Sequence, residues 1–472
     1  MKRRSGGFAF ARLAATDLEP TAVPERFTSR WLGSRLRALD APLRGRRYCL
    51  AFSGGLDSSV LLTALAALRS REGFSLRALH VDHGLHADSA RWAAAAQKQA
   101  RGLRVACEVV RLRIVHRRGE SLEALARQQR YAALTSRLAS QERLLTAHHQ
   151  DDQLETMLLA LMRGSGVRGL SGMEACSAIA HTRLLRPLLP VSRAQLEQFA
   201  RVRRLNWSED ASNVDERFDR NYLRRQLLPR LRERWPAAAA TASRSAAHLA
   251  EAQGLLERLG RRAAAQAADG AALRISSLRR LSMPERRNVL RCWIAGCGLP
   301  APDHRRLREI AGPMLEARQD ALPRVRWGGG ELRRHGDRLL AMAAQSADSP
   351  VSIAAWDWRG RPWLPLGPGA ALGLIADRHG DVNLSALPCP LRVEFRRGGE
   401  RLHAAHGRVV LKDLLQSQGI APWLRGSVPL LRAGGRIVAV ADLWLDAAYR
   451  PASDAATARG RFRWRRSTGG SE

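Results

Sequence analysis

The sequence predicts an α/β fold in which a Rossmann-like parallel sheet is followed by a mainly helical middle domain and a small α+β carboxyl-terminal domain. From Arg47 onward, short apolar runs of strand length alternate with longer segments of helical periodicity. Strands that alternate with helices of this length need crossover connections, and therefore a parallel sheet. Polar, glycine-containing segments follow several of these strands, at the sheet edge where parallel sheets bind ligands.

The expected elements follow one another regularly. The predicted strands are residues 48–52, 76–81, 105–110 and 144–147, and the predicted helices are residues 58–69, 89–101, 122–138 and 152–162. Three chemically distinctive segments come directly after strands, namely residues 53–58, 82–84 and 148–152. Because they share one edge of the sheet, we expect them to form one site.

Shifts in composition divide the chain into five segments. These are an N-terminal extension (1–45) with a helix near 31–39, an α/β domain (46–235), a helical and mixed domain (236–345), an α+β domain (351–456) and a basic flexible tail (457–472). Residues 346–350 read as a linker. A chain of 472 residues is too long for a single ordinary core, which agrees with several domains.

The composition favours a nucleic acid as partner. Lysine and arginine number 78 against 44 acids, a formal net charge of +34, and a field of that size attracts polyanions. No apolar run reaches the length of a membrane span, and we expect a cytoplasmic protein. The six cysteines are scattered and include no Cys-x-x-Cys pair, which argues against a disulfide framework and a cysteine zinc site.

The first strand leads into a loop suited to phosphate, built from Ser53, Gly54, Gly55, Leu56, Asp57 and Ser58. Glycines let the backbone approach a ligand, hydroxyls and amides donate to phosphate oxygens, and a helix amino end adds positive potential. A carboxylate beside phosphates makes sense if a metal ion lies between them, so Asp57 is a candidate metal ligand. The alternative interpretation is a plain turn in which Asp57 or Ser58 caps the helix.

The second segment runs His148-His149-Gln150-Asp151-Asp152 and continues to Glu155. Asp151 and Glu155 are four residues apart and share one helix face. Acids in a first helical turn are commonly only dipole partners, which remains an interpretation for Asp152. His148 could donate to phosphate or transfer protons near neutral pH, and Asp151 could bind magnesium or orient an amine.

The Ser-Gly-Gly-x-Asp-Ser loop resembles that of the PP-loop ATP pyrophosphatases, which cleave ATP between the α and β phosphates. The resemblance implies transfer of AMP to an oxygen, displacement of AMP by a nucleophile, and use of magnesium, for which Asp57 and Asp151 are the candidate ligands. Residues 163–170, a glycine-rich basic loop after the helix, look like those of one branch of this group, the tRNA(Ile)-lysidine synthetases. Further pieces appear in the order that this family shows, and the likeness spans about residues 47–235.

The likeness implies roles for particular residues. Asp57, His148, Asp151 and Arg127 would be catalytic, and Ser53, Gly54, Gly55, Leu56, Asp57 and Ser58 would bind ATP. Asp151, Glu155 and Arg224 would hold the amino acid substrate. The carboxyl-terminal part looks like the family's tRNA-binding domain, in which Arg396, Arg397, Lys412 and Arg425 would contact the RNA. For Arg127 and for the last group, the alternative is a solvated or structural arginine or lysine.

The implied reaction joins free L-lysine to C2 of the wobble cytidine of an isoleucine tRNA with a CAU anticodon, through an adenylated base. Lysidine, AMP and pyrophosphate would result, and the codon read would change from AUG to AUA. A tRNA thiolation enzyme with the same loop is the nearest rival, although such enzymes typically carry cysteine pairs. A non-catalytic RNA-binding protein on an inactive nucleotide fold is the other alternative, and the presence of Asp57, His148, Asp151 and Asp152 argues against it.

Overall fold

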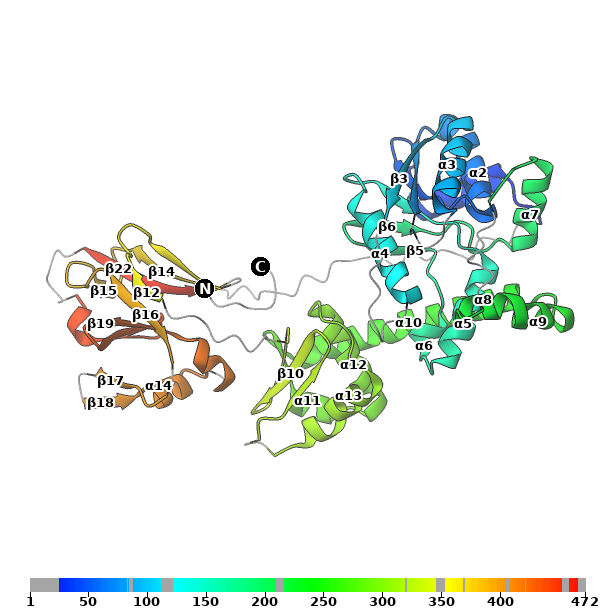
Figure 1. The fold of residues 1–472 in the computed structure, drawn as a ribbon. Coiled ribbons are helices and arrows are strands. Elements are labelled where there is room, and N and C mark those ends of the chain that lie inside the picture. The colour runs from blue at the N-terminus through cyan, green and yellow to red at the C-terminus, as the bar shows by residue number, and fades with distance from the viewer. Residues whose placement is uncertain are drawn as a thin grey trace. The chain divides into compact units, whose positions relative to one another are not determined.

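A computed structural model describes residues 25–82, 84, 88–112, 122–208, 216–318, 321–344, 353–367, 370–396, 398–404, 407–420, 422–451 and 458–465. The chain divides into two compact units, Met1–Leu256 and Glu257–Glu472 (Figure 1). The glycine-containing loop and the two-histidine segment both belong to the first unit. We describe each unit by itself.

A six-stranded sheet in the order β3-β2-β1-β4-β6-β5 forms the centre of the first unit. Its strands are β1 (Arg47–Ala51), β2 (Ser75–Asp82), β3 (Ala106–Arg111), β4 (Arg143–Leu145), β5 (Cys176–Ile179) and β6 (Thr182–Leu185). All neighbours pair in parallel except β5, which pairs antiparallel with β6 at the edge. The predicted parallel sheet is confirmed. The β5–β6 hairpin was not predicted, because strands of four residues are too short to show a clear alternation.

Helices cover this sheet and continue beyond it (Figure 1). They are α1 (Ser29–Asp40), α2 (Leu56–Glu72), α3 (Ser89–Gly102), α4 (Leu122–Ser136), α5 (Gln150–Met162), α6 (Val167–Leu170), α7 (Arg193–Val202), α8 (Asp219–Tyr222), the π-helical turn η2 (Leu223–Leu227), α9 (Leu228–Arg234) and α10 (Ala238–Ala267). The last of these carries the chain from the first unit into the second. Among the described residues, no helix has both the length and the apolarity needed to cross a bilayer.

The core of the first unit lies between β1 and its covering helices. Leu61, Leu62 and Leu65 of α2 are fully buried there. The same cluster includes Leu32 and Leu36 of α1, so this predicted helix packs into the sheet domain and is not part of an extension. Burial of each such leucine contributes about 1.5–3 kcal/mol, and the packed helices hold the ends of β1 and β4 in place.

The middle part of the second unit is mixed, as predicted for residues 274–342. Four helical segments, α11 (Ile275–Arg279), α12 (Met283–Gly296), α13 (His304–Glu309) and η3 (Ile310–Met314), accompany an antiparallel sheet in the order β7-β8-β11-β10-β9. The strands are β7 (Ala268–Asp269), β8 (Ala272–Arg274), β9 (Arg324–Trp327), β10 (Gly330–His335) and β11 (Arg338–Met342). Apolar residues from both layers, including Trp293 and Leu332, form one core.

The carboxyl-terminal part contains two larger sheets and a hairpin. One sheet comprises β12 (Ile353–Trp356), β16 (Leu391–Phe395), β19 (Pro429–Ala433), β20 (Arg436–Val440) and β21 (Trp444–Leu445). The other comprises β13 (Trp363–Gly367), β14 (Ala370–Ala376), β22 (Arg459–Arg465) and β15 (Val382–Asn383), and the hairpin is β17 (Arg401–Ala404) with β18 (Gly407–Val410). Short helices α14 (Leu411–Ser417), η4 (Pro422–Ser427) and η5 (Ala447–Tyr449) complete it.

The expectation of a flexible tail from residue 457 was wrong for the described residues 458–465. Strand β22 pairs antiparallel with β14 along its whole length and with β15 at one end. Phe462 is 4% exposed within the core of this part, and Trp464 packs against that core. Arginines occupy every second position, at 459, 461, 463 and 465. This basic composition masked a period-two strand pattern in which the alternate residues are buried.

Replacing Phe462 with alanine tests the structural role of β22. We expect the unfolding transition of the carboxyl-terminal part to lose about 3–5 kcal/mol, as for other buried aromatic side chains. Denaturant unfolding of the full chain, followed by tryptophan fluorescence, measures this loss. The exposed neighbour Arg463→Ala is the matched control and should change stability by less than about 0.5 kcal/mol. Equal, small effects of both variants would contradict the strand.

Candidate active site

The loop between β1 and α2 is shaped by hydrogen bonds of its own hydroxyl groups. Ser58 Oγ lies 3.0 Å from Ser53 Oγ and donates to Gly55 O at 3.1 Å. Gly55 N donates to Ser53 Oγ at 3.3 Å. Gly54 has a φ of 81°, a left-handed conformation that an L side chain rarely adopts. These bonds bend the chain sharply at the carboxyl end of β1, as the sequence predicted.

The amino end of α2 has no side-chain cap. Its N-cap residue is Gly55, and no side chain accepts a hydrogen bond there. The alternative interpretation, in which Asp57 or Ser58 caps the helix, is therefore wrong. Asp57 Oδ1 is buried and has no hydrogen-bond partner. Uncapped amides with a helix dipole behind them favour an anion, and an unsatisfied carboxylate oxygen beside them favours a cation.

His149 joins the loop to the acidic segment at the start of α5. Its Nε2 lies 3.5 Å from Asp57 Oδ2 and 3.6 Å from Asp152 Oδ2, and its Nδ1 lies 3.3 Å from Asp151 Oδ2. Asp152 Oδ2 also accepts a hydrogen bond from His149 N at 3.0 Å, which caps α5. The structure thus brings together the two segments that the sequence placed at one sheet edge.

The ring of His149 is an imidazolium. Burial alone would lower its pKa, but the carboxylates of Asp152, Asp151 and Asp57 outweigh burial and raise the pKa to about 10. Sequence reasoning assigned the chemistry to His148 and missed His149. The signal that could have found it is the residue's place as N-cap, directly before two acids.

His148 is neutral. Burial, together with the charges of Arg186, Arg220 and Arg130, outweighs the attraction of Asp152 and lowers the pKa of His148 to about 3. Its Nδ1 lies 2.9 Å from Thr146 Oγ1. A ring with this pKa does not exchange its proton at neutral pH, so the expectation that His148 transfers protons near pH 7 is not supported. It can still donate a hydrogen bond.

The acids of α5 are paired with arginines from the helix of residues 219–234. Glu155 accepts from Arg224 Nε at 2.5 Å and from Arg220 Nε at 2.7 Å. Asp152 Oδ1 accepts from Arg224 Nη2 at 2.7 Å. Burial raises the pKa of Asp152, but the charges of His149, Arg224 and Arg220 outweigh it and hold the pKa well below its usual range. Glu155 and Arg224, predicted to hold a substrate, hold each other here.

Asp151 has a separate set of partners. Its Oδ1 accepts from Arg232 Nη2 at 2.5 Å, and its Oδ2 accepts from Arg193 N at 2.9 Å. Burial raises the pKa of Asp151, but these donors and His149 outweigh it and keep the carboxyl ionised. Arg220 and Arg232 were not predicted as site residues. Arg220 lies four residues before Arg224, and Arg232 lies eight residues after it. The acids that these arginines face on α5 are four residues apart, and this spacing is the signal that could have identified them.

A π-helical turn lies in the middle of this arginine-bearing helix. The turn spans Leu223–Leu227 and ends two residues before Pro229, which lacks a backbone donor and lies in the first turn of α9. Wide turns of this kind occur frequently at functional sites. Here the turn lies between Arg220 and Arg232, both of which reach the acids of α5.

A second group of arginines lies near His148. Arg130 and Arg186 are cations whose pKa values are lowered by burial. Arg186 Nη1 donates to Glu174 O at 2.7 Å. The guanidinium of Arg127, predicted to be catalytic, is exposed and lies 5.3 Å from the centre of the Tyr131 ring. Buried positive charge of this kind favours an anionic ligand.

Among the described residues of the site, Asp57 offers the free carboxylate oxygen that a magnesium ion needs. Its buried Oδ1 is unsatisfied, whereas both oxygens of Asp151 already accept hydrogen bonds. The described residues contain no cluster of three or more His, Cys, Asp or Glu that could form an all-protein metal cage. Magnesium is commonly held by one or two carboxylates together with substrate phosphates, which agrees with a single ligand from the loop.

The predicted RNA-binding residues differ in their surroundings. Lys412 on α14 is exposed, and Arg396 Nε lies 3.7 Å from Glu400 Oε2. Arg425 is 9% exposed and donates to Ile420 O at 2.9 Å. The buried guanidinium of Arg425 therefore supports the turn before η4. This structural contact stands in place of the phosphate contact that we expected for Arg425. Arg397 lies outside the described residues.

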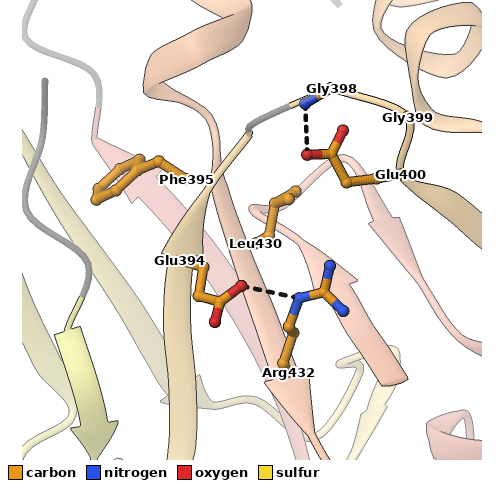
Figure 2. A pocket seen from close by; sticks show the side chains of 7 residues that line it. All are labelled: Glu394, Phe395, Gly398, Gly399, Glu400, Leu430 and Arg432. Carbon is orange, nitrogen blue, oxygen red and sulfur yellow. Dashed lines mark hydrogen bonds and ion pairs between the residues drawn. The ribbon is translucent and has the colours of Figure 1, made fainter. Parts of the chain in front are cut away.

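The residues on either side of Arg396 in the sequence, including Phe395 and Gly398, line a pocket, which Figure 2 shows. Glu394 forms an ion pair with Arg432 at 3.1 Å, and Gly398 N donates to Glu400 Oε1 at 2.8 Å. Glu394 is also paired with Arg392 at 2.9 Å. Among the residues that the structure describes there, Arg432 and Arg392 are matched by the carboxylate of Glu394, which leaves less positive charge for a phosphate.

Substitution of Asp57 tests the charged contact that His149 makes between the loop and α5. We expect Asp57→Asn to lower the pKa of His149 by about 1, because one of its carboxylate partners loses its charge. A proton-nitrogen correlation spectrum of the imidazole, recorded between pH 6 and 11, measures that pKa. The exposed acid variant Asp219→Asn should leave it near 10.

The raised pKa of His149 also predicts how the stability of the protein depends on pH. A histidine pKa raised by folding stabilises the protein fully below its unfolded value, about 6.5, and this contribution is lost as the pH rises towards 10. Wild type should therefore lose stability over that range, and Asp57→Asn should lose less. A His149 that titrates near 6.5 in wild type would contradict this charged contact.

Comparison with known protein families agrees with this site. A family profile described as a PP-loop domain matches residues 30–231. A TilS substrate binding domain profile matches residues 273–340, and a TilS substrate C-terminal domain profile matches residues 391–464. The first match begins within α1, in agreement with the packing of that helix into the sheet domain.

Individual relatives match over most of their length. The tRNA(Ile)-lysidine synthase of Alkalilimnicola ehrlichii is 43% identical over 84% of this chain and 89% of its own. That of Pseudomonas aeruginosa is 43% identical over 87% and 93%, and that of Coxiella burnetii 38% identical over 83% and 88%. Identity at this level across nearly the whole length shows that the chain belongs to the tRNA(Ile)-lysidine synthase family.

Proposed function

We propose that this chain joins free L-lysine to C2 of the wobble cytidine of an isoleucine tRNA with a CAU anticodon, using ATP. The products are lysidine, AMP and pyrophosphate, and the modified tRNA reads AUA in place of AUG. One observation carries the proposal. His149 lies within 3.5 Å of Asp57 of the phosphate loop and 3.3 Å of Asp151 on α5, so the nucleotide site and the acidic site adjoin.

The first half-reaction transfers AMP to the base. The C2 oxygen of cytidine attacks the α phosphate, the bond to the β phosphate breaks, and pyrophosphate leaves. The uncapped amides at the start of α2 and the hydroxyl of Ser53 bind the phosphate oxygens. Arg130 and Arg186, with Arg127 beside them, stabilise the negative charge that develops, and neutral His148 donates a hydrogen bond.

A magnesium ion held by Asp57 Oδ1 and the phosphates would neutralise charge on the leaving pyrophosphate. His149 holds the Asp57 carboxylate in position, since its Nε2 lies 3.5 Å from Asp57 Oδ2. Asp151, which was the second candidate ligand, is assigned a different task below; its oxygens accept hydrogen bonds from Arg232 and Arg193 in this structure.

The second half-reaction is attack of the lysine side-chain amine on C2, with release of AMP. Asp151 is the carboxylate that receives the substrate ammonium. Glu155 and Arg224 act as positioning residues, because Glu155 is 2% exposed and binds Arg224 and Arg220, which fixes Asp152 beside His149. A fixed acid next to the nucleotide site orients the amine toward the adenylated base.

For the tRNA we propose a contact through the outward arginines of β22. Arg463 and Arg465 are exposed, and within the described part of the chain no carboxylate pairs with either of them. Arg465 stacks 4.1 Å from the centre of the Trp363 ring. Arg461, on the same face, lies with Arg463 along a second pocket and pairs with Asp377 at 3.5 Å. Free arginines in a row on one sheet face suit a phosphate backbone.

Salt-dependent binding tests this surface. Each phosphate contact contributes about 1 to the slope of log affinity against log salt concentration. We expect Arg463→Gln with Arg465→Gln to lower that slope by about 2, measured by fluorescence anisotropy with labelled tRNA. Arg392→Gln, whose arginine is paired with Glu394, is the matched control and should leave the slope unchanged. An unchanged slope in the double variant would place the contact elsewhere.

A labelling assay tests the reaction itself. Incubation with ATP, labelled lysine and unmodified isoleucine tRNA should place the label at the anticodon. Asp57→Asn should slow this transfer about 100-fold or more, because it removes a charge aimed at the reacting phosphates, while tRNA affinity stays within about twofold. Sulfur entering the RNA in place of lysine would favour the thiolation rival, and full activity of Asp57→Asn would refute the assigned site.

A further inference from the structure

The carboxylates at the start of α5 are already bound by arginines from the helix of residues 219–234. Arg220 and Arg224 bind Glu155 and Asp152, and Arg232 binds Asp151. A substrate ammonium that approaches these carboxylates therefore meets resident guanidinium groups. Since like charges held side by side repel each other, entry of the ammonium requires one of these resident cations to leave.

Arg232 is the resident cation that can leave. Its side chain is 41% exposed, and Asp151 is the one carboxylate that it contacts within the described part of the chain. Arg224 holds Glu155 and Asp152 at once, and Arg220 is only 20% exposed. A half-exposed arginine with a single ion pair gains little from it and can return to water, so its release costs the least.

The atom that Arg232 holds is also the one that an amine needs. Asp151 Oδ2 accepts from Arg193 N, which ties α5 to the start of α7, and it also faces Nδ1 of His149, the N-cap residue of α5. Asp151 Oδ1 binds Arg232 at 2.5 Å. A new cation can therefore bind Asp151 Oδ1 without breaking the contacts that Oδ2 makes with Arg193 and His149.

We propose that Arg232 occupies the position of the substrate's side-chain ammonium and is exchanged for it when lysine binds. The inference rests on the proposed function, in which Asp151 receives that ammonium. Guanidinium and ammonium carry the same charge, so the exchange leaves the net charge of the network unchanged. Arg232 thus acts as an internal competitor, and the apparent affinity for lysine is the intrinsic affinity reduced by the strength of the Arg232–Asp151 pair.

Removal of the competitor should improve the KM for lysine. In assays with saturating ATP and tRNA, we expect Arg232→Gln to lower the KM for lysine about fivefold, equal to about 1 kcal/mol, with kcat within about twofold of wild type. Loss of a merely structural contact would raise KM or lower kcat and would not improve KM. Arg232→Lys keeps a cation and should return KM toward the wild-type value.

The matched control is Arg230→Gln, which removes an exposed arginine from the same helix and should leave KM unchanged. Thermal unfolding of each variant shows whether it folds. A KM for lysine that stays constant or rises in folded Arg232→Gln overturns the proposal, and a rise would mean that Arg232 contacts the substrate itself. Pyrophosphate release without lysine reports the first half-reaction separately. If wild type releases pyrophosphate but transfers no lysine, the proposed function fails, and the exchange fails with it.

Discussion

The site depends on one buried imidazolium. His149 is surrounded by the carboxylates of Asp57, Asp151 and Asp152, and these acids can lie so close together only because a positive charge is placed between them. The same ring joins two segments that are about ninety residues apart in sequence. Without it, the phosphate loop and α5 would repel each other at the point where nucleotide and amine have to meet.

The arginines complete this arrangement from outside. Arg220 and Arg224 neutralise Glu155 and Asp152, and Arg232 neutralises Asp151. These three carboxylates of α5 are therefore paired with arginines before any ligand binds. Beyond His148, the buried guanidinium groups of Arg130 and Arg186 provide positive potential. The site therefore has an acidic side suited to an amine and a basic side suited to a triphosphate, and His149 and His148 lie between them in different charge states.

Much of this could be predicted from the sequence. The alternation of strands and helices identified the parallel sheet, and the strand-end position of the loop and of α5 placed them together, because parallel strands present their carboxyl ends at one edge. Charge states could not be predicted in the same way. His148 and His149 are neighbours of identical type, and their pKa values differ by several units only because one ring faces carboxylates and the other faces arginines. Strand β22 was missed because its exposed half is all arginine.

The π-helical turn at Leu223–Leu227 has a consequence for how this helix can vary in length. In a regular α-helix, eight residues at about 100° each would rotate Arg232 roughly 80° around the axis from Arg224. A wider turn takes up more residues per revolution and brings both guanidinium groups to the same flank, where each reaches α5. With one residue fewer there and regular winding, the spacing would be seven residues, about 700°, which would still place Arg232 within roughly 20° of Arg224 around the axis. The π-helical turn thus accommodates one extra residue between the two arginines while both still reach α5, so their spacing and the local winding are linked.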